Sequence, residues 1–332
     1  MILASDVRVQ MYRVMVRSRA FEDLLVAQYW VGKSPIFAFG NGPLPGEMHT
    51  SHGQEPVAAG LCSVLRPEDM LTVGHRPHHI AIARGVNLKR MAAELFGKRA
   101  GLSGGRGGHM HLYDPSVNFA SSGIIAEGLG PAAGMALARR MQGKPGVAVG
   151  VIGDAAANQG AFHEVANLIG IYKLPMVILI EDNKWGVTTH KSASTSVERN
   201  SDRAAGYGLA SEFVSGNDAD TIHAACARAV ERARSGGGGT ILEVETARLQ
   251  GHFMGDQSDY ITGERKSYQV DPIPPYRAKL IDEAVLSEGQ AQSIEAEEKA
   301  LAEEAIRFGL DAPYPEPEEA LEHVFAPDRA AA

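Results

Sequence analysis

The sequence predicts an α/β protein with a parallel sheet, helices on both faces of that sheet, an N-terminal helical segment and C-terminal helices. Two continuous apolar runs, 147–152 and 176–180, are typical of buried strands, and a helical pattern over 158–172 lies between them. A strand, a crossover helix and a second strand of this kind form a right-handed parallel unit buried on both faces. The helix expected over 221–235 and the strand expected over 240–246 repeat the pattern.

The segments outside this centre are predicted to be helices and loops. Apolar residues at a spacing near 3.6 predict a helix over 5–30, and residues 274–310 are also expected to be helical. Residues 32–46, rich in Gly and Pro, and residues 101–122, rich in Gly, His and Ser, lack periodicity and are expected to be loops. Further helices are expected over 54–65, 88–96 and 134–141.

We expect one α/β domain over residues 1–332, built in three parts. Residues 1–120 form a helical and loop part, residues 121–270 hold the strand–helix–strand core, and residues 271–332 form an acidic helical tail. Because residues 1–120 contain no run of apolar strands, a second α/β domain is not expected within this chain.

Composition excludes several classes of protein. A hydrophobic content of 44% and a charged content of 22% are those of an ordinary soluble protein. Neither a membrane span of about 18 apolar residues nor a signal peptide is expected. The net charge of −8 disfavours general nucleic-acid affinity, which needs a cationic face. The two cysteines, Cys62 and Cys226, indicate free thiols in a reducing cytoplasm.

The acidic charge is concentrated at the C-terminal end. Residues 281–332 carry 14 acidic and 3 basic side chains. A solvated helix face followed by a terminal strap is the expected interpretation, and a docking surface for a basic partner is the alternative.

Polar residues follow both central strands at the point where each strand ends. Gly153 and Asp154 end the first strand, and Asn183 follows the second, 29 residues after Asp154. Parallel strands end at the same edge of a sheet, so these side chains should lie side by side, where open α/β sheets bind ligands. Carboxylate and carboxamide oxygens suit Mg²⁺, and the small residues 155–157 would let backbone N–H groups face phosphates. The alternative is that both dipeptides are simple turn residues.

A resemblance resolves this choice. The run "GDAAANQGAFHEVANLIGIYKLPMVILIEDNKWGVTT" resembles the thiamine-diphosphate motif, GDG followed about thirty residues later by NN. The whole chain, over 6–325, resembles the alpha subunits of the decarboxylating component of 2-oxo-acid and acetoin dehydrogenase complexes. The supporting segments are "HTSHGQEP", "GHRPHHIAIARGV", "MAAELFGKRAGLSGGRGGHMHL", "SSGIIAEGLGPAAG" and "ETARLQGHFMGD".

The resemblance implies a thiamine-diphosphate-binding fold and a role for each matching residue. Asp154, the Asn183 side chain and the Trp185 carbonyl would ligate Mg²⁺, and Gly153, Ala155 and Ala156 would contact the cofactor beside them. The residues implied to hold the diphosphate are Arg76 and Arg248, those implied to contact the aminopyrimidine ring are Gly123 and Ile125, and the histidines implied to line the catalytic cavity are His252, His49 and His75.

The resemblance also implies partners. The glutamate that activates the cofactor belongs to a beta subunit in this family, so an α2β2 heterotetramer is expected. The chain would cleave acetoin or decarboxylate pyruvate or a related 2-oxo acid, and a lipoyl-bearing acyltransferase or another acceptor would receive the product. The alternatives are a thiamine-diphosphate-dependent carboligase or lyase subunit without oxidation, and a non-catalytic subunit or Mg²⁺–nucleotide binder.

Several departures from the family pattern bear on the substrate more than on the cofactor. Ala155 replaces the second glycine of GDG, which requires a negative φ there, and Asp182 replaces the first Asn of NN. His75 precedes the phosphate arginine, as in the acetoin branch, and Pro77 replaces a glycine. Residues 33–46 are longer than in relatives, and their role is left open.

Single histidines carry less information. His163 and Glu164 begin an HExxH-like run, but position 167 is Asn, so a zinc site is excluded. His109 and His111, in the glycine-rich loop, are expected either to order that loop near the cofactor or to be plain structural histidines.

Overall fold

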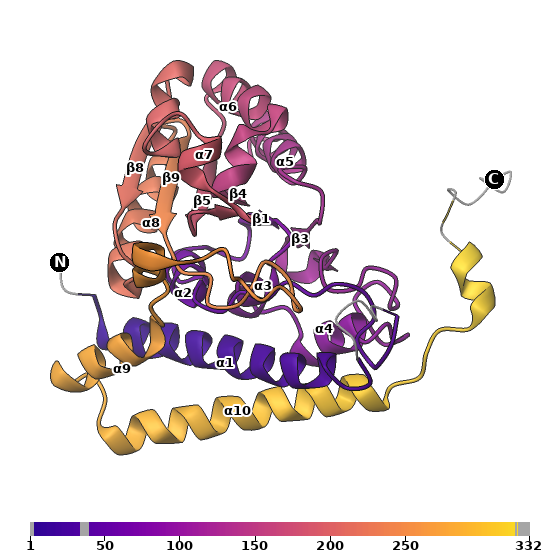
Figure 1. Cartoon of the computed structure of the whole chain (residues 1–332). Helices are drawn as coiled ribbons and strands as arrows, with labels where there is room; N and C mark the ends of the chain where they lie inside the picture. The colour runs from indigo at the N-terminus through magenta and orange to yellow at the C-terminus, as the bar shows by residue number, and fades with distance from the viewer. Residues whose placement is uncertain (1–2, 34–39, 323, 325–332) are drawn as a thin grey trace, which may run out of the picture.

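The computed structural model describes residues 3–33, 40–322 and 324, so part of the 33–46 segment lies outside the described residues. Seven strands within these ranges form one sheet, in the order β2-β3-β1-β4-β5-β9-β8 (Figure 1). Every neighbouring pair is parallel except β2 and β3. The strands are β1 (Met70–Val73), β2 (Tyr113–Asp114), β3 (Phe119–Ser121), β4 (Ala148–Gly153), β5 (Met176–Asp182), β8 (Ala210–Val214) and β9 (Thr240–Glu245).

Helices cover both faces of the sheet, which confirms the predicted fold class. Side chains alternate between the faces of β4 and β5, so Val149 and Leu179 pack into one apolar cluster while Ala148 and Ile178 pack into another. The first cluster includes residues of α2 (Glu55–Cys62), α3 (His78–Arg84) and α8 (Ala219–Arg234), and the second includes residues of α5 (Leu129–Met141) and α6 (Gly160–Tyr172).

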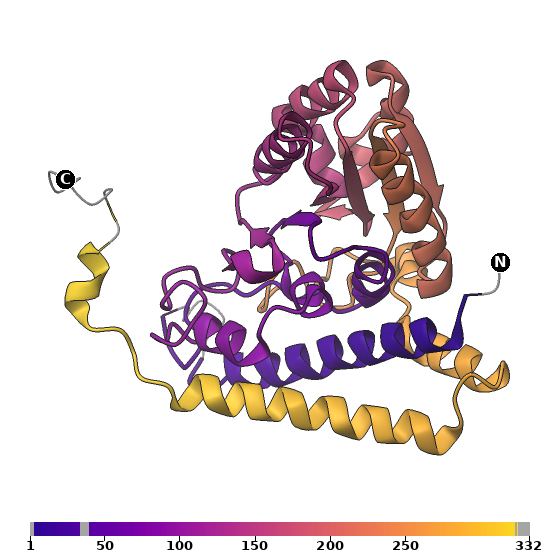
Figure 2. The ribbon, with the colours of Figure 1, turned by 180° about the vertical axis from the view of Figure 1, so that it is seen from behind.

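The long terminal helices form an added layer beneath this core. α1 (Ser5–Tyr29) and α10 (Glu288–Asp311) lie side by side in Figures 1 and 2, and Arg13 and Arg17 of α1 both pair with Glu298 of α10. Part of the acidic C-terminal helix is therefore neutralised by α1 instead of being solvated. Among the described helices, none combines the length and the apolar character that a membrane span requires.

One predicted helix is divided in the structure, and another begins later than expected. The helix expected over 274–310 is split into α9 (Ile273–Asp282) and α10, because Ala284 has a left-handed φ of 54° and Ser287 caps α10. The helix expected over 158–172 begins later, since Asp154–Asn158 forms the 3₁₀ turn η2 and Gln159 caps α6.

The shortest helices and strands were not predicted, because segments of a few residues are too short to show the apolar periodicity of a helix or a strand. β1 and β3 lie largely within residues 1–120 and join the same sheet as β4, without building a second one. The remaining elements are α4 (Leu88–Leu95), α7 (Lys191–Ser194), β6 (Trp185–Gly186), β7 (Thr189–His190), η1 (Pro115–Val117), η3 (Asn200–Tyr207), η4 (Gly263–Tyr268) and η5 (Pro317–Leu321).

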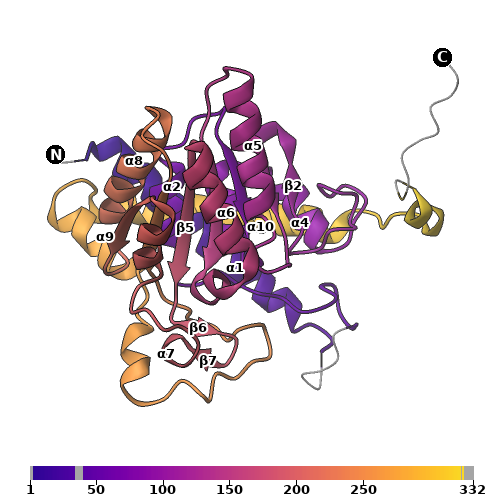
Figure 3. The ribbon, with the colours of Figure 1, turned by 90° about the horizontal axis from the view of Figure 1, so that it is seen from above.

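The strand order places a site at the carboxyl edge of the sheet. The chain runs from β1 to β3 on one side and then returns to place β4 on the other side of β1. Such a reversal of strand order opens a crevice beyond the strand ends. Figure 3 shows β6, β7, α7 and the orange segment after β9 projecting beyond this edge of the sheet.

Candidate active site

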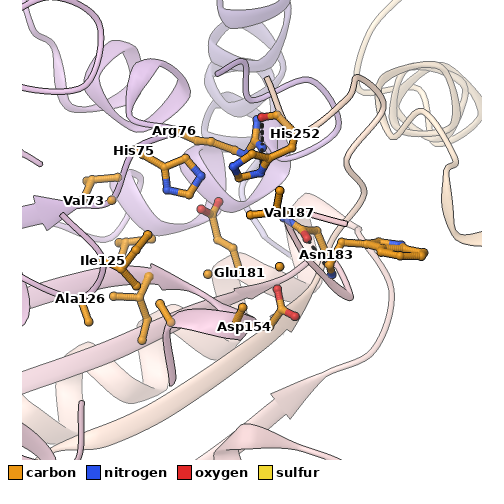
Figure 4. A pocket seen from close by; sticks show the side chains of 18 of the residues that line it. Val73, His75, Arg76, Ile125, Ala126, Asp154, Glu181, Asn183, Val187 and His252 are labelled. Carbon is orange, nitrogen blue, oxygen red and sulfur yellow. Dashed lines mark hydrogen bonds between the residues drawn. The ribbon is translucent and has the colours of Figure 1, made fainter. Parts of the chain in front are cut away.

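A cavity of about 290 Å³ lies at the carboxyl ends of β1, β4 and β5 (Figure 4). Most of the residues predicted to form the site line this cavity: His75, Arg76, Ile125, Gly153, Asp154, Ala155, Ala156, Asn183, Trp185 and His252. Gly123, His49 and Arg248 do not line it. His49 and Arg248 are buried against residues that do.

Asp154 is a buried carboxylate with an unmatched oxygen. Its side chain is 1% exposed, and Oδ2 has no hydrogen-bond partner among the described residues. Gly153 pairs with Glu181 across β4 and β5, so Asp154 comes opposite the buried Asp182. Burial first, and then the Asp182 carboxylate, raise the pKa of Asp154. A cation bound to Oδ2 would relieve both effects.

Local contacts fix the segments that carry Asp154 and Asn183. The Asn183 Oδ1 accepts a hydrogen bond from the Trp185 N–H at 3.1 Å, which fixes the carboxamide at the start of the β6–β7 hairpin. Ala155 is absent from the residues with positive φ, so its replacement of glycine is tolerated as expected. Gly186 makes room for it, because a Cβ there would lie 2.6 Å from the Ala155 Cβ. Carboxylate and carboxamide oxygens such as those of Asp154 and Asn183 are chemically suited to Mg²⁺.

Two arginines bring buried positive charge to the cavity. Arg76 donates from Nη1 to the Thr50 carbonyl at 2.7 Å, and burial together with Arg248 lowers the pKa of Arg76 to about 9. Arg248 donates to the Val187 carbonyl at 3.1 Å and to the Tyr260 hydroxyl at 2.6 Å, and its Nε is buried without a partner among the described residues. Two crowded guanidinium groups suit an anion such as a diphosphate.

Two of the seven described non-glycine residues with a left-handed φ lie at the same cavity. Ala126 and Val187 line it, and both have a left-handed φ, of 61° and 54°. Such a φ is costly for a β-branched residue, and conformations of this kind persist where the surroundings enforce them, often at ligand sites.

Four histidines gather beside Arg76. The His49 ring lies 4.8 Å from that of His75, 4.9 Å from that of His252 and 5.4 Å from that of His109. Burial and the Arg76 charge lower the pKa of His252 to about 4, and burial lowers the pKa of His109 to about 3. All four imidazoles are therefore neutral near pH 7, since the pKa values of His49 and His75 are lowered as well.

Hydrogen bonds assign the proton on two of these rings. Arg76 can only donate, so the His252 Nδ1, 3.3 Å from Nη2, accepts, and the ring proton sits on Nε2. The His109 Nε2 accepts from the His49 N–H at 3.2 Å and lies 3.1 Å from the His49 Nδ1. That Nδ1 must then carry the proton, which leaves the His49 Nε2 as an acceptor. The cluster thus holds a donor and an acceptor close together.

The cluster also has the composition of a metal site, with ring nitrogens of His49, His75 and His252 all within 4.8 Å of one another. The Arg76 guanidinium opposes this use. It adds a positive charge at the cluster and already uses the Nδ1 lone pair of His252. The cluster therefore suits acid–base and hydrogen-bonding chemistry better than metal binding.

Some site residues were not assigned from the sequence. Glu181 lines the cavity, and its Oε1 lies 2.7 Å from the His79 Nε2; its position as the first polar residue after an apolar strand was the available signal. Asp182 is the departure from the NN motif, and Lys191 donates to its Oδ2 at 2.6 Å. The cysteines are free, and Cys226 is buried.

Comparison with known proteins identifies the family of this chain. The profile of the family described as dehydrogenase E1 component matches residues 39–318. The alpha subunit of acetoin:2,6-dichlorophenolindophenol oxidoreductase from Bacillus subtilis (strain 168) is 35% identical over 327 residues, 97% of this chain and 95% of that protein. The corresponding subunit from Cupriavidus necator is 34% identical over 331 residues, 97% and 95% of the two chains.

Pyruvate dehydrogenases are similar as well. The pyruvate dehydrogenase E1 component subunit alpha of Porphyra purpurea is 31% identical over 326 residues, which cover 95% of this chain and 92% of that protein. The carboligase alternative gains no support from these relatives. This chain belongs to the dehydrogenase E1 component family, as the alpha subunit of a thiamine-diphosphate-dependent oxidoreductase.

Proposed function

We propose that this chain holds the diphosphate and Mg²⁺ end of thiamine diphosphate. The observation that carries the proposal is the buried Asp154 Oδ2, which has no hydrogen-bond partner within the described residues and shares a cavity with Arg76, beside a second buried arginine, Arg248. Asp154, the Asn183 side chain and the Trp185 carbonyl would hold Mg²⁺, and the two guanidinium groups would hold the diphosphate oxygens.

The rest of the cavity would orient the cofactor. Gly123 and the rim residue Ile125 would contact the aminopyrimidine ring, and Gly153, Ala155 and Ala156 would lie against the diphosphate. When bound, thiamine diphosphate supplies a carbanion that attacks a carbonyl carbon and a ring that accepts electrons. The protein residues supply orientation and proton transfer.

The histidine tautomers bear on the substrate. The His252 Nε2–H can donate to a carbonyl oxygen, and the His49 Nε2 can accept from a hydroxyl. An acyloin such as acetoin offers both groups, whereas a 2-oxo acid anion offers acceptors only. We therefore expect acetoin to be turned over better than pyruvate, with His75 in the same cluster binding the polar part of the substrate.

The cavity is expected to be completed by a beta subunit. Ile124, Ile125 and Val187 are 63%, 47% and 50% exposed at its rim, where a partner and the cofactor could cover them. The relatives are named as alpha subunits, and we expect the activating glutamate to come from the partner in an α2β2 assembly. A lipoyl-bearing acyltransferase or another acceptor would take the product. The expected location is the cytoplasm.

The experiment compares the purified chain with the chain co-expressed with its beta partner. Exchange of the thiazolium proton, followed by NMR after acid quench, should be accelerated only in the pair. The pair should oxidise acetoin with 2,6-dichlorophenolindophenol as acceptor, and pyruvate more slowly. Fast exchange by the lone chain would place the activating base here, and inactivity of the loaded pair towards both substrates would contradict the proposed function.

A further inference from the structure

A buried glutamate outside the cavity organises the glycine-rich loop. Glu94, at the C-terminal end of α4, is 0% exposed. Its carboxylate accepts backbone N–H hydrogen bonds from Ser103 at 2.7 Å, from Gly105 at 3.0 Å and from Gly107 at 2.6 Å. The loop therefore wraps around a single side chain.

The position of Glu94 is costly without these bonds. A carboxylate near the C-terminal end of a helix faces the negative end of the helix dipole, and a buried charge needs strong hydrogen bonds. Three charge-assisted bonds from the loop supply them. The hydrogen bonds that stabilise the buried Glu94 carboxylate therefore also hold the loop backbone in place.

The glycines of the loop allow this close approach. A Cβ at Gly101 would lie 2.3 Å from the Glu94 Oε2, and one at Gly107 would lie 2.3 Å from the His111 carbonyl oxygen. Gly105 has a φ of 80°, and a Cβ there would lie 2.4 Å from the Gly97 carbonyl carbon. Larger residues at these positions would push the backbone away from the carboxylate.

The loop ends on residues that touch the site from two sides. His109, two residues after Gly107, hydrogen-bonds to His49 through Nε2. Met110 and His111 lie against Gly123, where an added Cβ would be 2.9 Å from the Met110 Sδ and 3.3 Å from the His111 Nε2. A shift of the loop would therefore move both the histidine cluster and the segment before Ile125.

We infer that Glu94 is a positioning residue of the active site. Its carboxylate holds the 103–107 backbone, this backbone sets His109, and His109 fixes the His49 ring with its proton on Nδ1. Glu94 does not line the cavity, so it acts through His109 and not on the substrate. The effect on turnover rests on the proposed function, while the effect on the loop does not.

The first experiment measures turnover by the α–β pair. Glu94→Gln keeps the size of the side chain but turns an NH₂ donor towards backbone donors, and His109→Phe removes the acceptor for His49. Each should lower kcat by about tenfold with a smaller change in KM. Because Glu94 is inferred to act only through His109, the Glu94→Gln/His109→Phe double variant should be no slower than His109→Phe alone. His109→Gln, which restores an acceptor oxygen, should recover part of the rate.

The second experiment needs no activity. Hydrogen exchange of the peptide covering 101–112 should be faster in Glu94→Gln than in the native complex. The matched control is Glu298→Gln, which changes a buried carboxylate bonded to Arg13 and Arg17 far from the cavity. It should lower thermal stability but leave kcat and the exchange of 101–112 unchanged.

The outcomes separate this inference from the proposed function. Unchanged exchange of 101–112, fully additive rate effects, or equal rate loss in Glu298→Gln would each overturn the role of Glu94. Glu94→Asp, which withdraws the oxygens but keeps the charge, takes the place of Glu94→Gln if the latter does not fold. An inactive native pair that still shows faster loop exchange in the variant would contradict the proposed function alone.

Discussion

The Arg76 guanidinium binds both polar acceptors that His252 offers. Its Nη2 lies 3.3 Å from the His252 Nδ1 and 2.5 Å from the His252 carbonyl oxygen. These residues are 176 positions apart in the chain. Because the His252 Nδ1 accepts from Arg76, the ring proton lies on Nε2, which is left to donate within the histidine cluster. The contact also keeps the ring neutral, because a second proton on Nδ1 would be repelled by the guanidinium charge.

The His252→Ala substitution should lower kcat by roughly 10²-fold, the range expected on loss of a general acid or base. Cofactor affinity should change little, since the diphosphate is assigned to Arg76 and Arg248. Steady-state kinetics and calorimetry of the α–β pair measure the two effects. His223→Ala, in a half-buried histidine of α8 that bonds to Ser63 at the end of α2, is the matched control. Near-normal turnover by the His252 variant would contradict an acid–base role for His252 and would indicate that His49 or His75 performs it.

The Asp154→Ala substitution should abolish Mg²⁺-dependent cofactor binding while the fold stays intact. Stability should not fall, because the change removes a buried like-charge contact with Asp182. Titration calorimetry with thiamine diphosphate and Mg²⁺ tests binding, and thermal unfolding tests the fold. Asp202→Ala, in an exposed aspartate of η3, is the control. Undiminished affinity would remove Asp154 from the metal site.

The Lys191→Met substitution should destabilise the chain by about 3–5 kcal/mol, the cost of breaking a buried ion pair from one side. Lys191 is buried, and its Nζ lies 2.6 Å from Asp182 and 2.7 Å from Glu243. Its loss leaves the buried Glu243 carboxylate without a cation among the described residues, while Asp182 keeps Lys184 at 2.9 Å. Urea unfolding measures the loss. Arg228→Met, which breaks an exposed pair with Glu212, should cost less than about 1 kcal/mol. Equal losses of unfolding free energy in both variants would contradict the expectation that a buried ion pair is costlier to break than an exposed one.

Stability should fall on acidification below about pH 6.5, the pKa of histidine in an unfolded chain. His252 and His109 have folded pKa values of about 4 and about 3, so the unfolded chain binds protons that the folded chain cannot. The part of the stability that depends on these two neutral histidines is therefore fully present above pH 6.5 and is lost as the pH falls towards these values. Arg76 and Arg248 oppose protonation of His252, and only the Asp256 carboxylate favours it among the causes of its shift. Unfolding free energies measured between pH 7 and pH 4 should decrease less steeply in a His109→Phe/His252→Ala double variant.

The sequence alone determined the sheet core and the placement of Asp154 and Asn183 at one edge of the sheet. β4 and β5 were predictable because a strand buried on both faces must be apolar throughout, and their ends were predictable because polar residues follow at once. Asp154 and Asn183 could be paired because adjacent parallel strands end together, a relation that follows from local pattern and short separation.

Only the tertiary structure decided what surrounds those residues. His49 and His109 are 60 positions apart, and Lys191 meets Glu243 across 52 positions, so no local period links them. Arg248 proved to be covered by Tyr260 instead of lining the cavity, and Glu94 proved to organise a loop that composition described only as irregular. Such contacts form between segments that are distant in the chain, and their positions are set by the packing of the whole core. No single stretch of sequence therefore contains the information that predicts them.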